Sequence, residues 1–351
     1  MIKNYLTTLI LFWGVCFAYA QTLIGDIVYT LNEAQMTAQV EEKTGGYTGE
    51  ITIPAEVVVG GKSYRVVAIG NGAFYRAVNL TKVNLPATLT TIDDDAFYGC
   101  VRLQDMAIPE GVTYIGYEAF GMCHEFTKVK LPETALSLGK KLFVSCRKLT
   151  AVTFPSKLAQ IPDRIFHNCQ KLSEVVLPQS IDSIGYSAFW GCLALKNIII
   201  PPSVKDIDES AFARSGLVQI ELPEGMTEID TLLFSNCTSL TTVILPSTLT
   251  HVRKYAFQKC TNLQKVVSKA LVAPVYETDA FEAIPVNTPL HIDTEATGYE
   301  AWDKFLLVKD FTTGIAAVKS VAKKNKVYDL CGKEVNNSYR GLRIVNGQKV
   351  M

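Results

Sequence analysis

Seven cysteines recur at nearly constant spacing, and this pattern suggests chemistry more directly than any other in the sequence. Each cysteine lies three residues after a phenylalanine, as in the segment AFYGC at residues 96–100. Cysteines in such a row can form disulfides, bind a metal, act as nucleophiles or pack as small buried side chains. The seven are Cys100, Cys123, Cys146, Cys169, Cys192, Cys237 and Cys260.

The spacing argues against a metal site, because zinc sites use ligand pairs two to four residues apart and no such pair occurs here. Disulfides are the stronger alternative in an exported protein. However, equivalent side chains on stacked turns point in parallel, and seven is an odd number. Ser215 takes the place of one cysteine and cannot form a disulfide, but it can fill a small donor position. We therefore expect a reduced, buried cysteine ladder whose S–H groups meet backbone carbonyls.

The phenylalanines reveal an internal repeat. Their intervals are 23 residues six times, then 22, 23 and 24. Between them recurs the pattern Leu-x-x-Val-x-Leu-Pro, whose alternation predicts a strand that ends at the proline. One turn cannot bury its own apolar face, so neighbouring turns must stack. We predict a mainly β solenoid of 23-residue turns over residues 66–282, built around Phe74, Phe97, Phe120, Phe143, Phe166, Phe189, Phe212, Phe234, Phe257 and Phe281.

The combined motif L-x-x-V-x-L-P followed by A-F-x-x-C resembles the BspA-type, or Treponema pallidum-type, leucine-rich repeat of exported bacterial surface proteins. The resemblance implies caps at both ends, placed at residues 21–65 and 283–314. Alternating segments at 27–31, 37–40 and 51–53 fit a β cap at the N-terminus. Near the other end, Tyr299, Trp302 and Phe305 have the spacing of one face of a short helix that would cover the last turn.

The two ends of the chain carry targeting signals. Lys3, an apolar run at residues 6–17 and the sequence Ala18-Tyr19-Ala20 predict a signal peptide at residues 1–20. Cys16 would suggest a lipoprotein anchor, but the residues before it form a poor lipobox, so soluble export is preferred. No other stretch is apolar enough to cross a bilayer, and we expect no membrane span after signal cleavage.

After a linker at residues 315–325, the tail at 326–351 contains two alternating strand candidates, KVYDLCGKEV and GLRIVNGQKV. Asn346-Gly347 is a good tight-turn pair. The tail resembles the C-terminal sorting domain of the type IX secretion system, although Arg343 stands where that family usually has an aromatic residue. The alternative is a small terminal sheet that packs on the solenoid.

The composition excludes several function classes. The chain has 351 residues, and its 34 basic and 34 acidic residues cancel, so charge does not indicate nucleic acid or an anionic membrane. The four histidines lie in separate repeats or segments, and no G-x-S-x-G, P-loop or G-x-G-x-x-G motif occurs. We predict a protein that is not an enzyme, with no catalytic residues, no metal and no cofactor.

Binding is the usual role of a solenoid, so the outward positions are the candidate sites. Val176, Ile199 and Ile244 predict an exposed apolar run on the main strands; it marks a protein-binding surface or reflects the strand preference of β-branched residues. A second column after each phenylalanine carries aromatic rings that anchor interfaces or stack on sugars. The candidate binding residues are Lys82, Asn84, Lys128, Lys130, Val176, Ile199, Ile244, Tyr98, His167 and Trp190.

These observations favour an exported adhesion or recognition module at a bacterial surface. Its partner would be a protein or cell-surface ligand, and the family resemblance implies host extracellular-matrix proteins among the candidates. The alternative function is a structural or assembly subunit of the cell surface without a host ligand. The identity of the ligand and the oligomeric state do not follow from the sequence.

Overall fold

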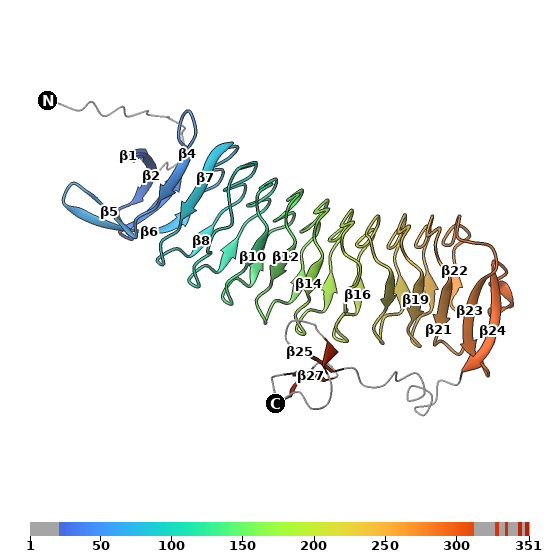
Figure 1. The fold of residues 1–351 in the computed structure, drawn as a ribbon. Coiled ribbons are helices and arrows are strands. Elements are labelled where there is room, and N and C mark those ends of the chain that lie inside the picture. The colour runs from blue at the N-terminus through green and yellow to red at the C-terminus, as the bar shows by residue number, and fades with distance from the viewer. Residues whose placement is uncertain (1–20, 312–326, 330–333, 336–342, 346–347, 351) are drawn as a thin grey trace, which may run out of the picture.

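The computed structural model describes residues 21–311, 327–329, 334–335, 343–345 and 348–350. The predicted signal peptide at 1–20 and the linker at 315–325 lie outside the described residues. Residues 21–311 form one elongated stack of turns, as predicted from the repeat (Figure 1). Within the described part of the chain, no helix has the length and hydropathy needed to cross a bilayer.

The main sheet is built from the Leu-x-x-Val-x-Leu-Pro strands, which pair in parallel between successive turns. It is divided into three pieces, with the orders β4-β7, β10-β12-β14 and β17-β19-β21-β23-β24. The breaks fall at residues 105–107 and 197–199, which form no strand. The strands are β4 (Thr48–Thr52), β7 (Asn79–Asn84), β10 (Lys128–Lys130), β12 (Ala151–Thr153), β14 (Glu174–Val176), β17 (Gln219–Glu221), β19 (Thr242–Leu245), β21 (Lys265–Ser268), β23 (Thr288–Asp293) and β24 (Phe305–Phe311).

A second sheet is made of two-residue strands from the second apolar position of each turn, and it continues the sheet of the N-terminal cap. Its pieces have the orders β6-β8-β9-β11, β13-β15-β16 and β18-β20-β22, where β6 (Lys62–Ile69) belongs to the N-terminal cap. The strands are β8 (Thr91–Ile92), β9 (Tyr114–Ile115), β11 (Ser137–Leu138), β13 (Gln160–Ile161), β15 (Ser183–Ile184), β16 (Asp206–Ile207), β18 (Glu228–Ile229), β20 (His251–Val252) and β22 (Val275–Tyr276).

The ten repeat phenylalanines form the third side of the core. Their rings stack in one column, with centroids 4.9–5.8 Å apart between successive turns. The backbone around each ring, here called the Phe turn, is bonded to the next one. The N–H groups of Lys141, Phe143 and Ser145 donate to the carbonyls of Asp163, Ile165 and His167, for example. The turns are therefore joined by backbone hydrogen bonds even where no strand forms.

Nine of the ten Phe turns have left-handed backbone on both sides of the ring, and the turn of Phe281 has it on one side. Lys141 and Ser145, which flank Phe143, both have φ of 57°, and Arg164 and Asn168 repeat this around Phe166. Non-glycine residues adopt this conformation at a steric cost. The hydrogen bonds to the next turn hold them there, so the conformation depends on the stack rather than on local sequence preference.

The seven cysteines are buried and free, and each meets a backbone carbonyl. The sulfur of Cys100 lies 3.0 Å from the carbonyl oxygen of Phe74 in the preceding turn, and the other six make the equivalent contact at 2.9–3.3 Å. Ser215 occupies the interrupted position, with its hydroxyl 3.3 Å from the sulfur of Cys237. Burial raises the thiol pKa of Cys100 and Cys169 to about 12. These thiols are therefore held protonated and cannot act as nucleophiles at neutral pH.

The N-terminal cap is a β structure with more strands than the three predicted segments. The predicted segments correspond to β2 (Ile27–Asn32), β3 (Thr37–Glu41) and β4. The additional strands are β1 (Gln21–Ile24) and the hairpin of β5 (Glu56–Val59) with β6 (Lys62–Ile69). Tyr47 closes the phenylalanine column, since its ring lies 4.6 Å from that of Phe74.

The C-terminal cap differs from the predicted short helix. Only Tyr299–Ala301 is helical, as a single 3-10 turn, and Phe305 begins strand β24. The three aromatic residues are nevertheless all buried, and Trp302 and Phe305 lie against Phe281, the last ring of the column. Pairing of β24 with β23 satisfies backbone groups that a longer helix at the end of the sheet would leave unpaired, so the strand prevails.

The described residues of the tail form four short strands where two were predicted. Each candidate segment is divided in two, giving β25 (Val327–Asp329), β26 (Glu334–Val335), β27 (Arg343–Val345) and β28 (Gln348–Val350). They pair antiparallel in the order β26-β25-β27-β28. β27 and β28 pair with each other, and the tight turn predicted at Asn346 and Gly347 between them lies outside the described residues.

We expect the ladder thiols to be unreactive in the native protein because they are buried and protonated. In the mature chain carrying Cys331→Ser, a native thiol assay should detect essentially no free thiols. The same assay after denaturation without reductant should detect all seven. Recovery of fewer thiols from the denatured, unreduced chain would show that some of them form disulfides.

Removing one ring from the column should destabilise the protein strongly. Phe143 is fully buried between two neighbouring rings, so Phe143→Ala should lower the free energy of unfolding by about 3–5 kcal/mol in urea denaturation. Leu136→Ala is the matched control, because Leu136 is 49% exposed and its truncation leaves no cavity. An equal loss of unfolding free energy in the two variants would contradict the conclusion that the phenylalanine column stabilises the fold.

Candidate binding surfaces

The predicted polar residues near the N-terminal end of the main sheet lie on its solvent-facing side, here called the outer face. Lys82 and Asn84 both bond to Glu50 of β4, at 2.8 and 3.0 Å. Lys130 lies 3.5 Å from Glu110, and Lys128 is exposed beside it. Lys82, Asn84 and Lys130 therefore join neighbouring turns, which accounts for their residue types without a ligand.

The predicted apolar residues lie farther along the same face, but they are not one continuous run. Val176 and Ile199 are 82% and 84% exposed. Ile244 is only half-buried rather than exposed, and Glu221 lies between it and Ile199 in the order of turns. Two large β-branched side chains are thus left almost fully in water next to a charged residue.

This apolar region coincides with the second break in the main sheet. Within residues 21–311, no backbone hydrogen bond joins residues 197–200 to β14 or β17. The next turn is the only one of 22 residues in the repeat. It begins at Gly216, which passes so close to the turn before it that a side chain there would overlap the carbonyl oxygen of Leu193. The second sheet is also interrupted here, between β16 and β18. Both sheets are thus interrupted at the step where one turn is a residue short.

A groove of about 560 Å³ opens on the outer face at this break. This volume is within the usual range of ligand-binding pockets. Residues 198–200 and 220–222 line it. The outward side chains around it include Asn197, Ile199, Gln219, Glu221, Ile244 and Lys269.

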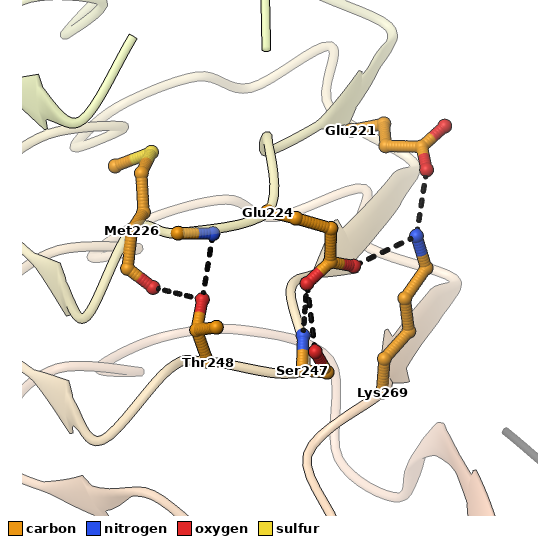
Figure 2. A network of polar contacts seen from close by, with 7 residues as sticks. Glu221, Glu224, Met226, Ser247, Thr248 and Lys269 are labelled. Carbon is orange, nitrogen blue, oxygen red and sulfur yellow. Dashed lines mark hydrogen bonds and ion pairs between the residues drawn. The ribbon is translucent and has the colours of Figure 1, made fainter. Parts of the chain in front are cut away.

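A polar network forms one side of the groove (Figure 2). The Lys269 ammonium lies 2.8 Å from Glu221 and 3.5 Å from Glu224. Glu224 also accepts hydrogen bonds from the N–H and hydroxyl of Ser247, at 3.0 and 2.8 Å. Burial alone would raise the pKa of Glu224, but the bonds from Ser247 and the charge of Lys269 outweigh it and lower that pKa. The carboxylate of Glu224 is therefore charged at neutral pH and fixed in place.

The aromatic column beside the Phe turns is arranged differently. Tyr98 stacks on Tyr75 with centroids 5.4 Å apart, and its other side lies against Gly121, where a Cβ atom would clash with the ring. His167 and Trp190 stack at 4.4 Å.

Arg214, from the turn after Trp190, lies 5.1 Å from the centre of the indole ring. Because His167 belongs to the preceding turn, the two groups cover opposite faces of that ring. Both faces of the Trp190 ring are therefore occupied, which disfavours stacking of a sugar on that ring.

The histidines and cysteines offer no reactive arrangement. Among the described residues, no group of three His, Cys, Asp or Glu side chains could hold a metal ion. His291 bonds to Asp310 at 2.6 Å, while burial and then Arg164 and Lys141 lower the pKa of His167. His167 is thus favoured as a neutral ring that stacks on Trp190.

The outer-face groove was only partly foreseen from the sequence. Ile199 and Ile244 were predicted from strand alternation, whereas Asn197, Gln219, Glu221 and Lys269 were not among the predicted binding residues. Val176, which was also predicted, is exposed on the same face but is not among the residues that line the groove. The signal that could have located them is the 22-residue interval between Phe212 and Phe234. In this chain, the one short interval coincides with an interruption of both sheets.

Protonation of His167 should destabilise the fold. Since its pKa is lower in the folded chain than the ordinary value of about 6.5, the unfolded chain binds the proton first, and stability falls as pH drops through that value. His167→Phe keeps a ring on Trp190 but cannot take up a proton. It should therefore reduce the loss of melting temperature between pH 7.5 and pH 5, whereas His251→Gln, at an exposed position, should not. An unchanged pH dependence in His167→Phe would exclude this contribution.

Comparison with known proteins identifies a family and solved structures that this chain resembles. The model of the BspA type leucine rich repeat region matches residues 67–196 and 159–286, in six copies. A search of curated proteins found no match. Among solved structures, a leucine-rich repeat protein from Bacteroides ovatus is 21% identical, with a TM-score of 0.58 over 84% of this chain and 92% of that one.

A leucine rich cell surface protein from Faecalibacterium prausnitzii is 23% identical, with a TM-score of 0.38 over 83% of this chain and 98% of that one. The Treponema pallidum leucine-rich repeat protein is 23% identical, with a TM-score of 0.41 over 50% of this chain and 91% of that one. The first of these structures shares the fold, and the family model covers more than half of the chain. The chain therefore belongs to the BspA-type leucine-rich repeat family.

Proposed function

We propose that the mature chain is an exported recognition or adhesion module at the bacterial surface, which binds a protein or cell-surface ligand and is not an enzyme. The observation that carries this proposal is the groove on the outer face, with Ile199 exposed beside it on a rigid stack. Exposed apolar side chains with polar neighbours are typical of interaction sites. The buried, protonated thiols and the separated histidines give no comparable support for catalysis.

Delivery to the surface is part of the same proposal. The first 20 residues have the pattern of a signal peptide, and residues 326–351 resemble a type IX sorting domain. Family membership is compatible with this location. Host extracellular-matrix proteins are the first ligands to test, since the resemblance implies them.

Substitution within the groove should weaken binding without unfolding the protein. Ile199→Glu places a charge where an apolar contact is expected, and Ile199 is 84% exposed, so the fold should tolerate it. We expect binding of the mature chain to matrix proteins or host cells to fall about tenfold or more, a cost of about 1.4 kcal/mol. Circular dichroism should show an unchanged melting temperature.

Val286→Glu is the matched control, because Val286 is 87% exposed and lies outside the groove. It should bind as the unsubstituted chain does. Equal binding by both variants would contradict a role for the groove. Concentration-dependent self-assembly, with no saturable binding to cells or matrix proteins, would favour the structural-subunit alternative instead.

A further inference from the structure

The groove has polar groups placed to meet a polypeptide backbone. Asn197, Gln219 and Thr242 occupy equivalent positions on three consecutive turns and line one side of it. In residues 21–311, none of their side chains makes a hydrogen bond. Amide and hydroxyl groups can both donate and accept, as a peptide backbone requires. The three side chains therefore form a free polar row along the axis of the stack.

The main chain at the break is also unpaired. At the first break, at residues 105–107, the carboxylate of Asp105 accepts the N–H groups of Thr127 and Lys128. At the second break, within the described residues, neither backbone nor side chain bonds residues 197–200 to β14 or β17. A ligand with its own donors and acceptors would satisfy these groups, since unpaired backbone groups are costly when water is excluded.

The apolar side chains set the length and direction of the ligand. Ile199 and Ile244 both line the groove and lie two turns apart, with Glu221 on the turn between them. Neighbouring turns of a stacked sheet are about 4.8 Å apart, which gives about 10 Å, and an extended chain covers this distance with about three residues at about 3.3 Å each. Apolar β-branched side chains at the two ends of such a stretch would meet Ile199 and Ile244, and the residue between them would lie at the level of Glu221.

The charges that line the groove indicate which side chains the ligand carries between its apolar residues. The charged residues that line the groove are Glu221, Glu224 and Lys269, so its lining has one excess negative charge. Glu224 is already bonded to Ser247 and Lys269, whereas the side chain of Glu221 is 60% exposed and only one of its oxygens meets Lys269. Glu221 is thus the group that can accept a lysine or arginine from a partner. An acidic glycan or acidic peptide would be repelled.

We propose that the groove binds an extended polypeptide segment in which apolar β-branched residues alternate with basic ones. The segment runs along the axis of the stack, with its apolar side chains on Ile199 and Ile244 and a basic side chain at Glu221. This inference rests on the proposed function, because it names the class of partner for the same surface.

The test uses two labelled synthetic peptides, GVKVKVSG and GVEVEVSG, and fluorescence anisotropy with the mature chain. The basic peptide should bind about tenfold more tightly than the acidic one, and added salt should reduce the difference. Glu221→Gln should weaken binding of the basic peptide, and Glu221→Lys should reverse the preference. Ile199→Ser should weaken binding of both peptides, while Val286→Ser should change neither.

The outcomes separate this inference from the proposed function. If neither peptide binds, or if Glu221→Lys leaves the preference unchanged while the variant is folded by circular dichroism, the inference is wrong. Cell or matrix binding that still depends on Ile199 would then leave the proposed function intact. If the peptides bind as expected but the mature chain binds no cell or matrix protein, the proposed function fails and the peptide site remains.

Discussion

The structure depends on one constraint, which is that every turn must present its apolar groups at the same height as its neighbours. The phenylalanine rings meet at 4.9–5.8 Å, and the Phe turns exchange three backbone hydrogen bonds with the next turn. Both interactions require the same register over the whole stack. Tyr47 at one end and Trp302 with Phe305 at the other protect the last rings from water. Such closing contacts are needed because each turn is stabilised only by its neighbours.

The cysteines follow from this constraint rather than from redox or metal chemistry. Each S–H reaches back to the carbonyl of the previous phenylalanine, so a small donor side chain is required at that point. Ser215 occupies the equivalent place with another small buried side chain, whose hydroxyl meets the sulfur of Cys237 rather than a phenylalanine carbonyl. The cysteine ladder therefore belongs to the architecture, and the chemistry that distinguishes this protein lies on the outward side of the turns.

The two solvent-facing columns differ for a physical reason. In the aromatic column, equivalent rings on successive turns are close enough to cover one another, as His167 and Trp190 do. The faces of these two rings are covered by other side chains of the protein. On the outer face the turns separate at residues 197–200, and Ile199 has no ring or backbone partner of that kind. The irregularity, not the regular part of the repeat, provides the surface best suited to a ligand.

The sequence by itself determined the repeat, the strand-forming segments, the buried positions and the outward placement of Val176 and Ile199, because these follow from local alternation and period. It also contained the 22-residue interval before Phe234. Only the tertiary structure decided that both sheets are interrupted at this interval. It also decided that Lys269 reaches Glu221 from two turns away, and that the predicted capping helix is largely strand β24. Each of these outcomes depends on which backbone groups of distant turns come into register. Local residue preferences do not report that register, because hydrogen bonds between turns can override them.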